Sequence, residues 1–550
     1  MLRLSSFGRV AWVGIALVFV LLFGTVWYTT NSLNNSWNLP YCVPREQRPC
    51  PLPPPVAPAL PTSPATPIDH KNTTYPETHR TSKLHYLVPS SVSRDGVCVG
   101  IASALLNRYP TPVILGWKGE GDYNAKNHLA KLRIISRYLH NLEDADDGDL
   151  VIVVDAFDII AQIPAEATLQ LYFDMMRTAN ERLAARQGLA VEEARAQGIY
   201  QSLLWGAEKG CFPPMFHEAQ CWLVPDSDAP HNQWGPKTTT GEAPWRFPKA
   251  LNSGAVIGPL SDLLAFIDAT IVLVDETYDP EFRYRDSDQL YLARLYARQE
   301  YHRNIGLVPR DKPYPGIQNG KGRTLPKPRV NESEVTEYHV TVDFEYAFAQ
   351  HHCYNELFMQ KLKYNNWDKT TTIPKDYLDE GDGFRPYSIQ MPSYIYKALA
   401  RIWDSIDEDE KPTSTALEWV QNLRMNTNVA TQKIFAFYHS TCYKQNFVER
   451  FQDYWFFPYI DTLLRTAAKE NRKGTPISAN PIDGRMWIAA NSHPVRLDVE
   501  GRDLEGYGGV FTDLEEESYL TYRELCGKSW NKVFKIEEKE EQKGGQDKSP

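Results

Sequence analysis

Two aspartates follow a run of apolar residues in the stretch VIVVDAFD, residues 151–158. The apolar run predicts a buried strand, and Asp155 and Asp158 stand three positions apart where that strand ends. Two carboxylates at this spacing can face one hard cation, such as Mn²⁺ or Mg²⁺, which also bridges the phosphates of a substrate. The alternative is that the acids only cap the turn after the strand. The elements around the turn decide between the two interpretations.

The elements on either side of the acid pair alternate between strands and helices. We expect strands over 96–103, 111–117 and 150–155, and helices over 130–142 and 167–187. This order is typical of an α/β fold with a mainly parallel sheet flanked by helices. In such sheets ligands bind outside the carboxyl ends of the strands, which is where Asp155 and Asp158 are expected. The pattern therefore favours a functional site.

Composition and motifs exclude several classes of protein. The 550-residue chain has a net charge of −10 and no dense basic stripe, so no nucleic-acid partner is expected. It contains neither the GxGxxG nor the GxxxxGK[ST] nor the GxSxG motif. A phosphatase built on an aspartyl nucleophile would carry a D-x-D-x-[TV] motif after its first strand, and VDAFDII does not supply it. The missing nucleophile motif, together with LNSG and DSDQ, also disfavours a lumenal metal-dependent phosphohydrolase. Cys211 and Cys221 are spaced to close a small loop, as are Cys42 and Cys50.

The N-terminal end predicts a membrane anchor. Residues 10–28 carry no charged side chain and follow Arg3 and Arg9, which indicates an uncleaved signal-anchor rather than a cleaved signal peptide. We expect a cytosolic tail over 1–9, the transmembrane anchor over 10–28, a proline-rich stem over 29–80, a catalytic domain over 81–470, a C-terminal extension over 471–535 and a disordered tail over 536–550. The layout predicts a single-pass type II protein of the Golgi membrane, with the ER as the alternative, and sequons at Asn34, Asn72 and Asn331 agree with a lumenal orientation.

Six further motifs follow one another along the globular part. They are AKLRIISRYL from residue 130, LLWGAEKGCFP from 203, LNSGAVIGP from 251, DSDQLYLARLY from 286, VDFEYAFAQ from 342 and IFAFYHSTCYKQNF from 434. In this order, and together with VVDAFDI, they resemble the glycosyltransferase domain of the procollagen lysyl hydroxylases and its fungal relatives. The resemblance extends over roughly residues 96–470.

The resemblance implies roles for individual residues. Asp155 and Asp158 would bind Mn²⁺, and His439 would complete the metal site. Phe157 would lie by the uridine of the donor, and Lys131 and Lys444 would lie near its phosphates. Asp288, Gln289 and Asn252 would contact the donor sugar, although Asn252 can also belong to an ordinary turn, and one of Asp286 and Asp288 is expected to cap the next helix. Asp288, Gln289 and Asn252 are thus the candidate catalytic residues of the predicted donor site.

One loop departs from the family pattern. Ser440, Thr441 and Cys442 replace the glycine and asparagine that follow the family's histidine. The histidines that compete with His439 for the metal are His339, His351 and His352. The altered loop is the feature that favours the main alternative, an inactive binding or scaffold protein that keeps the fold and has lost turnover.

The sequence thus predicts an enzyme, a Mn²⁺-dependent hexosyltransferase with a GT-A-like fold. Its donor would be a UDP-sugar, UDP-galactose or UDP-glucose, and the acceptor a hydroxyl of a glycan, a glycolipid or a protein. The family resembled retains the anomeric configuration, which the resemblance implies for this chain as well. No lysyl hydroxylase domain is expected, since no H-x-D…H iron set follows the transferase-like part.

Overall fold

The computed structural model describes residues 80–119, 128–142, 145–215, 218–230, 233–235, 237, 241–304, 335–372, 388–495 and 506–535. The described residues other than 275–278 belong to one folded unit. The predicted site lies in this unit.

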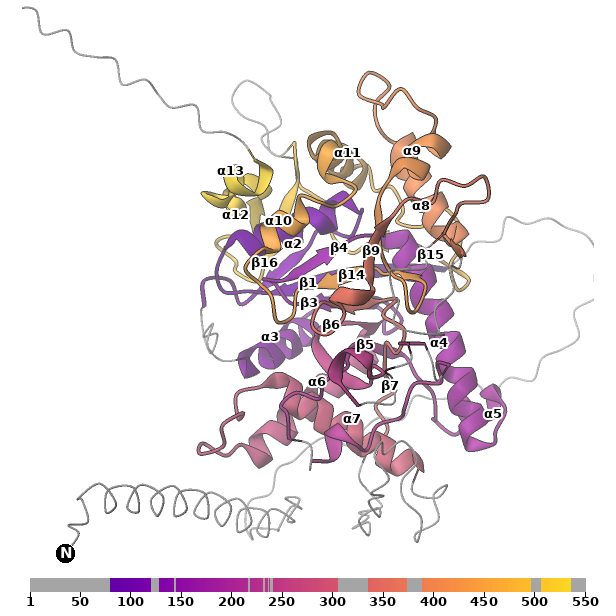
Figure 1. Ribbon diagram of the computed structural model, residues 1–550. Helices are drawn as coiled ribbons and strands as arrows, with labels where there is room; N and C mark the ends of the chain where they lie inside the picture. Colours follow the sequence, from indigo (N-terminus) through magenta and orange to yellow (C-terminus); the bar gives the residue numbers. More distant parts are fainter. Residues whose placement is uncertain are drawn as a thin grey trace, which may run out of the picture. The chain divides into compact units, whose positions relative to one another are not determined.

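A nine-stranded sheet forms the centre of this unit (Figure 1). Its strand order is β17-β16-β2-β1-β3-β6-β5-β7, and β15 also pairs with β1. The strands are β1 (Arg80–Pro89), β2 (Val113–Leu115), β3 (Leu150–Val154), β5 (Leu203–Glu208), β6 (Ala250–Pro259), β7 (Val340–Val342), β15 (Arg485–Ala489), β16 (Gly509–Thr512) and β17 (Tyr519–Thr521). The region expected as a C-terminal extension therefore contributes β15, β16 and β17 to this sheet.

The expectation of a mainly parallel sheet is corrected to a mixed sheet, in which five strand pairings are parallel and three are antiparallel. Strand β6 runs antiparallel to both of its neighbours, β3 and β5, and β17 runs antiparallel to β16. The pairs of β1 with β2, β3 and β15 are parallel, as are β2 with β16 and β5 with β7. Almost every residue of β6 is buried, and such a continuous run gives no sign of strand direction.

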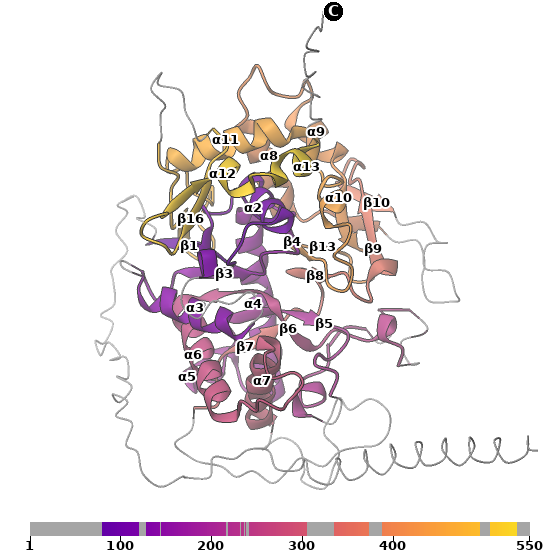
Figure 2. The same cartoon turned by 90° about the vertical axis from the view of Figure 1, so that its left-hand side faces the viewer.

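Helices cover both faces of the sheet (Figure 2). In β3, Ile152 and Val154 belong to one core with α2, α4, α8 and α11, while Val151 and Val153 belong to a second core with α3, α6 and α7. This alternation follows from the two-residue repeat of a strand. The helices are α2 (Asp95–Leu106), α3 (Leu129–His140), α4 (Ala165–Gln187), α5 (Val191–Ala196), α6 (Leu260–Thr277), α7 (Asp288–Asn304), α8 (Ser393–Asp404), α9 (Ala416–Asn422), α10 (Phe447–Phe451), α11 (Ile460–Arg472), α12 (Tyr522–Cys526) and α13 (Ser529–Phe534).

The segment 96–103 was expected to be a strand and is part of helix α2 instead. Nine of the twelve residues of α2 are buried, because the helix lies between the sheet and other helices. An apolar run that is buried on nearly all sides has no clear periodicity, so the sequence pattern does not separate a buried helix from a buried strand. The expected strand over 111–117 and the expected helices over 130–142 and 167–187 are confirmed as β2, α3 and α4.

Three small sheets accompany the central one. The sheet β4-β14-β8 matters most for the site, because β14 runs antiparallel to β4 and parallel to β8. Its strands are β4 (Ile159–Ala161), β8 (Ala349–His351) and β14 (Phe437–His439). The other two sheets consist of β9 (Met359–Leu362), β12 (Met425–Asn428) and β13 (Lys433–Ile434), and of β10 (Thr370–Thr372) and β11 (Ser388–Gln390).

Three disulfides link parts of the described chain. The predicted pair Cys211–Cys221 is confirmed, and Cys98–Cys526 and Cys353–Cys442 join residues far apart in the sequence. Cys98–Cys526 connects α2 to α12. Cys42 and Cys50 lie outside the described residues.

The predicted membrane anchor is corrected. Among the residues that the structure describes, no helix is long and apolar enough to cross a membrane. The long apolar helix α6, for example, has 18 residues and is interrupted by Asp262, Asp268 and Asp275. Residues 10–28 and the three sequons lie outside the described residues. The anchored fold class and the Golgi or ER membrane localisation are therefore not carried further.

Candidate metal centre

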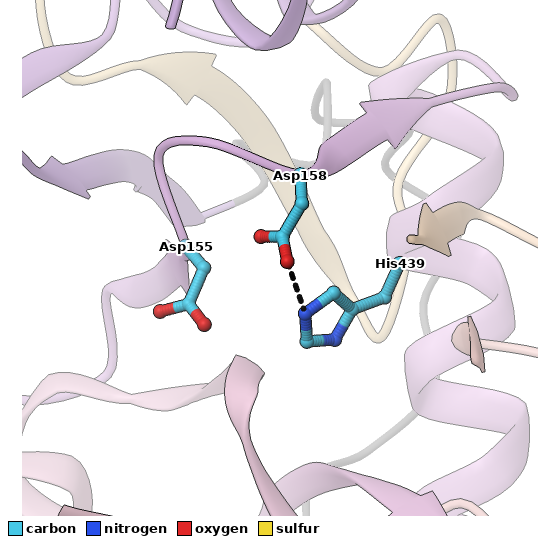
Figure 3. A group of neighbouring side chains, drawn as sticks. All are labelled: Asp155, Asp158 and His439. Carbon is cyan, nitrogen blue, oxygen red and sulfur yellow. Dashed lines mark ion pairs between the residues drawn. The ribbon is translucent and has the colours of Figure 1, made fainter. Parts of the chain in front are cut away.

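Asp155, Asp158 and His439 converge in the folded unit (Figure 3). Each offers one ligand atom, and these atoms all lie within 4.8 Å of one another. Asp158 and His439 are buried, whereas about a third of the Asp155 side chain is exposed. The two aspartates of VIVVDAFD and His439 were predicted as metal ligands from the sequence. They lie at least 281 positions apart in the chain and meet at one place in the fold.

Strand pairing brings these three residues together. Asp155 follows β3 directly, and Asp158 immediately precedes β4. Because β14 pairs antiparallel with β4, His439 at its end lies opposite Ile159. The backbone N–H of Ser440 also donates a hydrogen bond to the carbonyl oxygen of Asp158, at 2.8 Å. The tight turn between β3 and β4 therefore faces the end of β14.

Position 254, in the LNSG motif, must be glycine because the ring of His439 packs directly against its backbone. The backbone N–H of Asp155 donates to the carbonyl oxygen of Gly254 at 2.8 Å, which joins β3 to β6 at the site. A Cβ atom at position 254 would overlap the ring of His439. Only glycine allows this close approach between the ring and the β6 backbone.

Lys131 lies between two carboxylates. Its Nζ is 2.7 Å from Asp155 and 3.0 Å from Asp288, and it donates to the carbonyl oxygen of Ser253 at 2.7 Å. Burial disfavours the charged ammonium, but Asp155 and Asp288 outweigh it and raise the pKa of Lys131. Lys131 therefore balances the charge of Asp155 and Asp288, and its predicted role toward donor phosphate stays a prediction.

Lys444 forms a comparable ion pair on the other side of the turn. Its Nζ lies 2.8 Å from Asp158, and Nε2 of His439 lies 3.3 Å from the same carboxylate. Burial favours the neutral acid, yet His439 and Lys444 hold the pKa of Asp158 well below its usual range. Asp158 in turn raises the pKa of His439 against the effect of burial. Two basic side chains, His439 and Lys444, thus balance the negative charge of Asp158.

A polar cluster lies beside these pairs. Nδ2 of Asn252 donates to Glu208 at 2.6 Å and to Oε1 of Gln289 at 3.2 Å, and the N–H of Ser253 also donates to Gln289, at 3.3 Å. The cluster sets the ends of β5 and β6 against the first turn of α7. The structure thus brings Asn252 and Gln289 together, as predicted, whereas Asp288 is committed to Lys131.

Two residues of the site were not predicted from the sequence. Glu208 ends β5, and burial raises the pKa of its carboxyl against the opposing effects of His439 and Asn252. His351 ends β8, its ring centroid lies 4.9 Å from that of His439, and its Nδ1 is 3.9 Å from Glu208. Glu208 stands within the motif AEKGCFP, and this acid between a strand and a cysteine was the available signal for it. His351 was weighed only as a competitor of His439.

The other competing histidines have different partners. The ring of His339 stacks on Tyr200 at 3.6 Å, and Nδ1 of His352 lies 2.8 Å from the guanidinium of Arg450. Burial lowers the pKa of His351. The ring of His351 lies against that of His439 and is not one of the groups that meet at the acid pair. Within the described part of the chain, His439 is the histidine that joins Asp155 and Asp158.

Phe157 lies between the two aspartates in the turn, and 36% of its surface is exposed. The guanidinium of Arg94 lies 5.6 Å from the centroid of its ring. A half-exposed aromatic ring in this place is free to receive a flat partner on its open side. Its predicted place by the uridine stays a prediction.

The three candidate metal ligands, Asp155, Asp158 and His439, suit a hard divalent cation. Two carboxylates and one imidazole are ligand types that Mn²⁺ accepts, and Nδ1 of the buried His439 has no hydrogen-bond partner among the described residues.

Among known proteins, no family model matches the chain and no curated protein is significantly similar to it. A function is therefore inferred from the site alone.

Proposed function

We propose that the protein is a metal-dependent glycosyltransferase that moves a hexose from a UDP-sugar to an acceptor hydroxyl. The observation that supports this is the convergence of Asp155, Asp158 and His439 beside two lysines and an amide-rich polar cluster. A metal site, cationic groups for a diphosphate and amides for sugar hydroxyls are the three things that such a donor requires.

In this proposal Asp155, Asp158 and His439 bind the metal, and Mn²⁺ fits their mixed oxygen and nitrogen donors. When bound, the cation neutralises the charge that develops on the departing diphosphate. Lys444 is the residue best suited to contact donor phosphate, because 65% of its side chain is exposed and its contact with Asp158 is exchangeable. Phe157 offers its open face to the uracil ring.

The sugar of the donor would lie against the polar cluster. Asn252 and Gln289 both carry an amide that donates and accepts, which matches hydroxyl groups in either role. Glu208 already accepts a hydrogen bond from Asn252 at 2.6 Å, and its second carboxylate oxygen would accept one from a sugar hydroxyl. The alternative of an inactive scaffold drew on the altered loop after His439, yet His439 lies beside Asp158 in spite of that change.

The test is metal-dependent turnover of sugar nucleotides by the full chain. We expect release of UDP from UDP-galactose or UDP-glucose in the presence of Mn²⁺, loss of that activity with EDTA, and recovery when Mn²⁺ is restored. GDP-mannose serves as the matched donor control and should be a poor substrate. Equal activity with and without chelator, or no turnover of any UDP-sugar, would contradict the proposal.

A further inference from the structure

Three exposed aromatic residues share an unusual position in the sequence. Phe212, Tyr354 and Tyr443 each follow directly after a cysteine that forms a disulfide. Their exposed fractions are 46%, 42% and 51%. Single exposed apolar side chains are common on proteins, but three that repeat one local arrangement call for a shared explanation. We call these three residues the aromatic rim.

The rim residues follow three strand ends that contact one another. Phe212 comes four residues after Glu208 at the end of β5, Tyr354 three after His351 at the end of β8, and Tyr443 four after His439 at the end of β14. Glu208 and His351 are 3.9 Å apart, and the rings of His351 and His439 are 4.9 Å apart. The three rim segments therefore all follow strand ends that meet at the polar centre of the site.

Contacts at the rim tie each segment to the site. The carbonyl oxygen of Phe212 accepts a hydrogen bond from Nε2 of Gln289, at 3.5 Å. The carbonyl oxygen of Tyr354 accepts from Nζ of Lys209 at 3.4 Å, next to Glu208. Tyr443 directly precedes Lys444, which pairs with Asp158.

The backbone of the rim is fixed in conformations that favour display of the rings. Cys353–Cys442 joins the Tyr354 segment to the Tyr443 segment, and Cys211–Cys221 closes the loop that carries Phe212. Tyr354 has a φ of 62° and Cys442 a φ of 69°, in the left-handed region that bulky residues rarely adopt. Such outliers persist where the surrounding structure enforces them, and they concentrate at ligand sites. Flat rings on a fixed backbone also lose little entropy on binding.

We propose that the aromatic rim binds the acceptor and that the acceptor is a carbohydrate chain. This inference rests on the proposed function and names the substrate class of the same site. The apolar C–H face of a pyranose ring stacks on a flat aromatic ring, while its hydroxyls remain free for polar groups at the edges. Tyrosine combines such a face with a polar hydroxyl, and Lys444, which directly follows Tyr443 and is 65% exposed, supplies a charged neighbour. In the transfer step, the acceptor oxygen bonds to C1 of the hexose, the bond from C1 to UDP breaks, UDP leaves with the electron pair, and the proton of the acceptor hydroxyl passes to the departing diphosphate.

The experiment compares acceptor classes and rim variants in the full chain. Acceptors are a panel of di- and trisaccharides, a peptide with serine, threonine and hydroxylysine hydroxyls, and a long-chain alcohol in detergent. We expect transfer to a saccharide. We expect Tyr443→Leu and Tyr354→Leu each to raise the KM for the acceptor about fivefold relative to wild type and to leave the KM for the donor nearly unchanged. Tyr443→Phe and Tyr354→Phe keep the ring and should recover most of the affinity. Trp367→Leu is the matched control, because Trp367 is 91% exposed and follows no cysteine.

Each outcome bears on one of the two proposals. UDP-sugar turnover with transfer only to the peptide or the alcohol would overturn the carbohydrate acceptor and leave the proposed function standing. A larger rise in donor KM than in acceptor KM would assign the rim to the donor and overturn the inference as well. If no UDP-sugar is turned over, the proposed function fails, and saccharide binding by calorimetry then decides: binding that Tyr443→Leu weakens supports the rim as a carbohydrate site, and no binding overturns it.

Discussion

The two lysine–carboxylate pairs of the site have nearly equal distances but differ in the burial of the lysine and in the number of carboxylates that it contacts. Lys131 lies 2.7 Å from Asp155 and Lys444 lies 2.8 Å from Asp158. The side chain of Lys131 is only 13% exposed and meets a second carboxylate, Asp288, whereas that of Lys444 is 65% exposed. Lys131 stands in the first turn of α3, and Lys444 stands in the loop after β14.

This difference indicates two separate tasks for chemically similar pairs. Removing a buried ammonium from two carboxylates leaves uncompensated charge, so Lys131 is part of the fold as much as of the site. An exposed ammonium can leave its partner at little cost, so Lys444 is able to give up Asp158 to a metal and turn to a phosphate. The Lys131 side is thus a fixed support, and the Lys444 side is the exchangeable part of the site.

The largest effect is expected from Asp158, the carboxylate on the exchangeable side. Asp158→Asn keeps the size and hydrogen-bonding capacity of the side chain but removes the charge that a hard cation requires. We expect transfer to fall by at least about 100-fold, with added Mn²⁺ restoring chelated wild type and not the variant. The measurement is UDP release together with a far-UV spectrum to confirm folding. Asp453→Asn, at an exposed ion pair with Lys361, is the matched control, and near-normal, chelator-insensitive activity of Asp158→Asn would remove the metal from the proposal.

The fixed side of the site was largely predictable from the sequence. A strand of four apolar residues ending in an acid, and the helical spacing around Lys131, are local signals that identified β3 and α3. The direction of β6 and the helical state of residues 96–106 were not predictable in the same way. Both segments are buried on nearly all sides, and their conformation depends on partners that lie far away in the sequence.

The exchangeable side was harder to predict, because tertiary contacts create it. His439 enters the site through the pairing of β14 with β4. The loop after it is fixed by the disulfide from Cys442 to Cys353, which lies 89 residues before Cys442. The residues Ser440, Thr441 and Cys442 therefore looked like a defect in the sequence, although Cys442 supplies a covalent link in the fold. Glu208 and His351 were missed for the same reason, since only the folded chain places them beside His439.

The next largest effect is expected from Lys131, and it should fall on stability as well as activity. Lys131→Met leaves Asp155 and Asp288 facing each other without a cation, which we expect to lower the free energy of unfolding by about 3 kcal/mol. Urea denaturation measures this. The double variant Lys131→Met/Asp288→Asn removes one of the two charges and should regain part of the loss. A Lys131→Met protein as stable as wild type would mean that this lysine is not the fixed support.

An intermediate effect is expected from the disulfide that joins the two loops on the exchangeable side. The double variant Cys353→Ser/Cys442→Ser frees the segment between His439 and Lys444, so we expect Mn²⁺ affinity to fall about tenfold, as for other losses of support behind a metal ligand. Isothermal titration with Mn²⁺ measures it. Cys211→Ser/Cys221→Ser removes a disulfide whose loop carries none of the three metal ligands and should leave Mn²⁺ affinity within about twofold of wild type. Equal loss in both double variants would show a general weakening of the fold instead.

The smallest effect is expected from Lys444 itself, and it separates the two sides most clearly. Lys444→Met should change the free energy of unfolding by no more than about 1 kcal/mol, because the lysine is mostly exposed and His439 still faces the buried Asp158 after the substitution. It should still raise the donor KM about tenfold, since a charge-assisted contact with phosphate is lost. Lys361→Met, which removes another exposed lysine from an ion pair, controls for the general loss of a surface charge. If Lys444→Met lowers stability as much as Lys131→Met does, or leaves the donor KM unchanged, the two lysines have the same role and the distinction between a fixed and an exchangeable side is wrong.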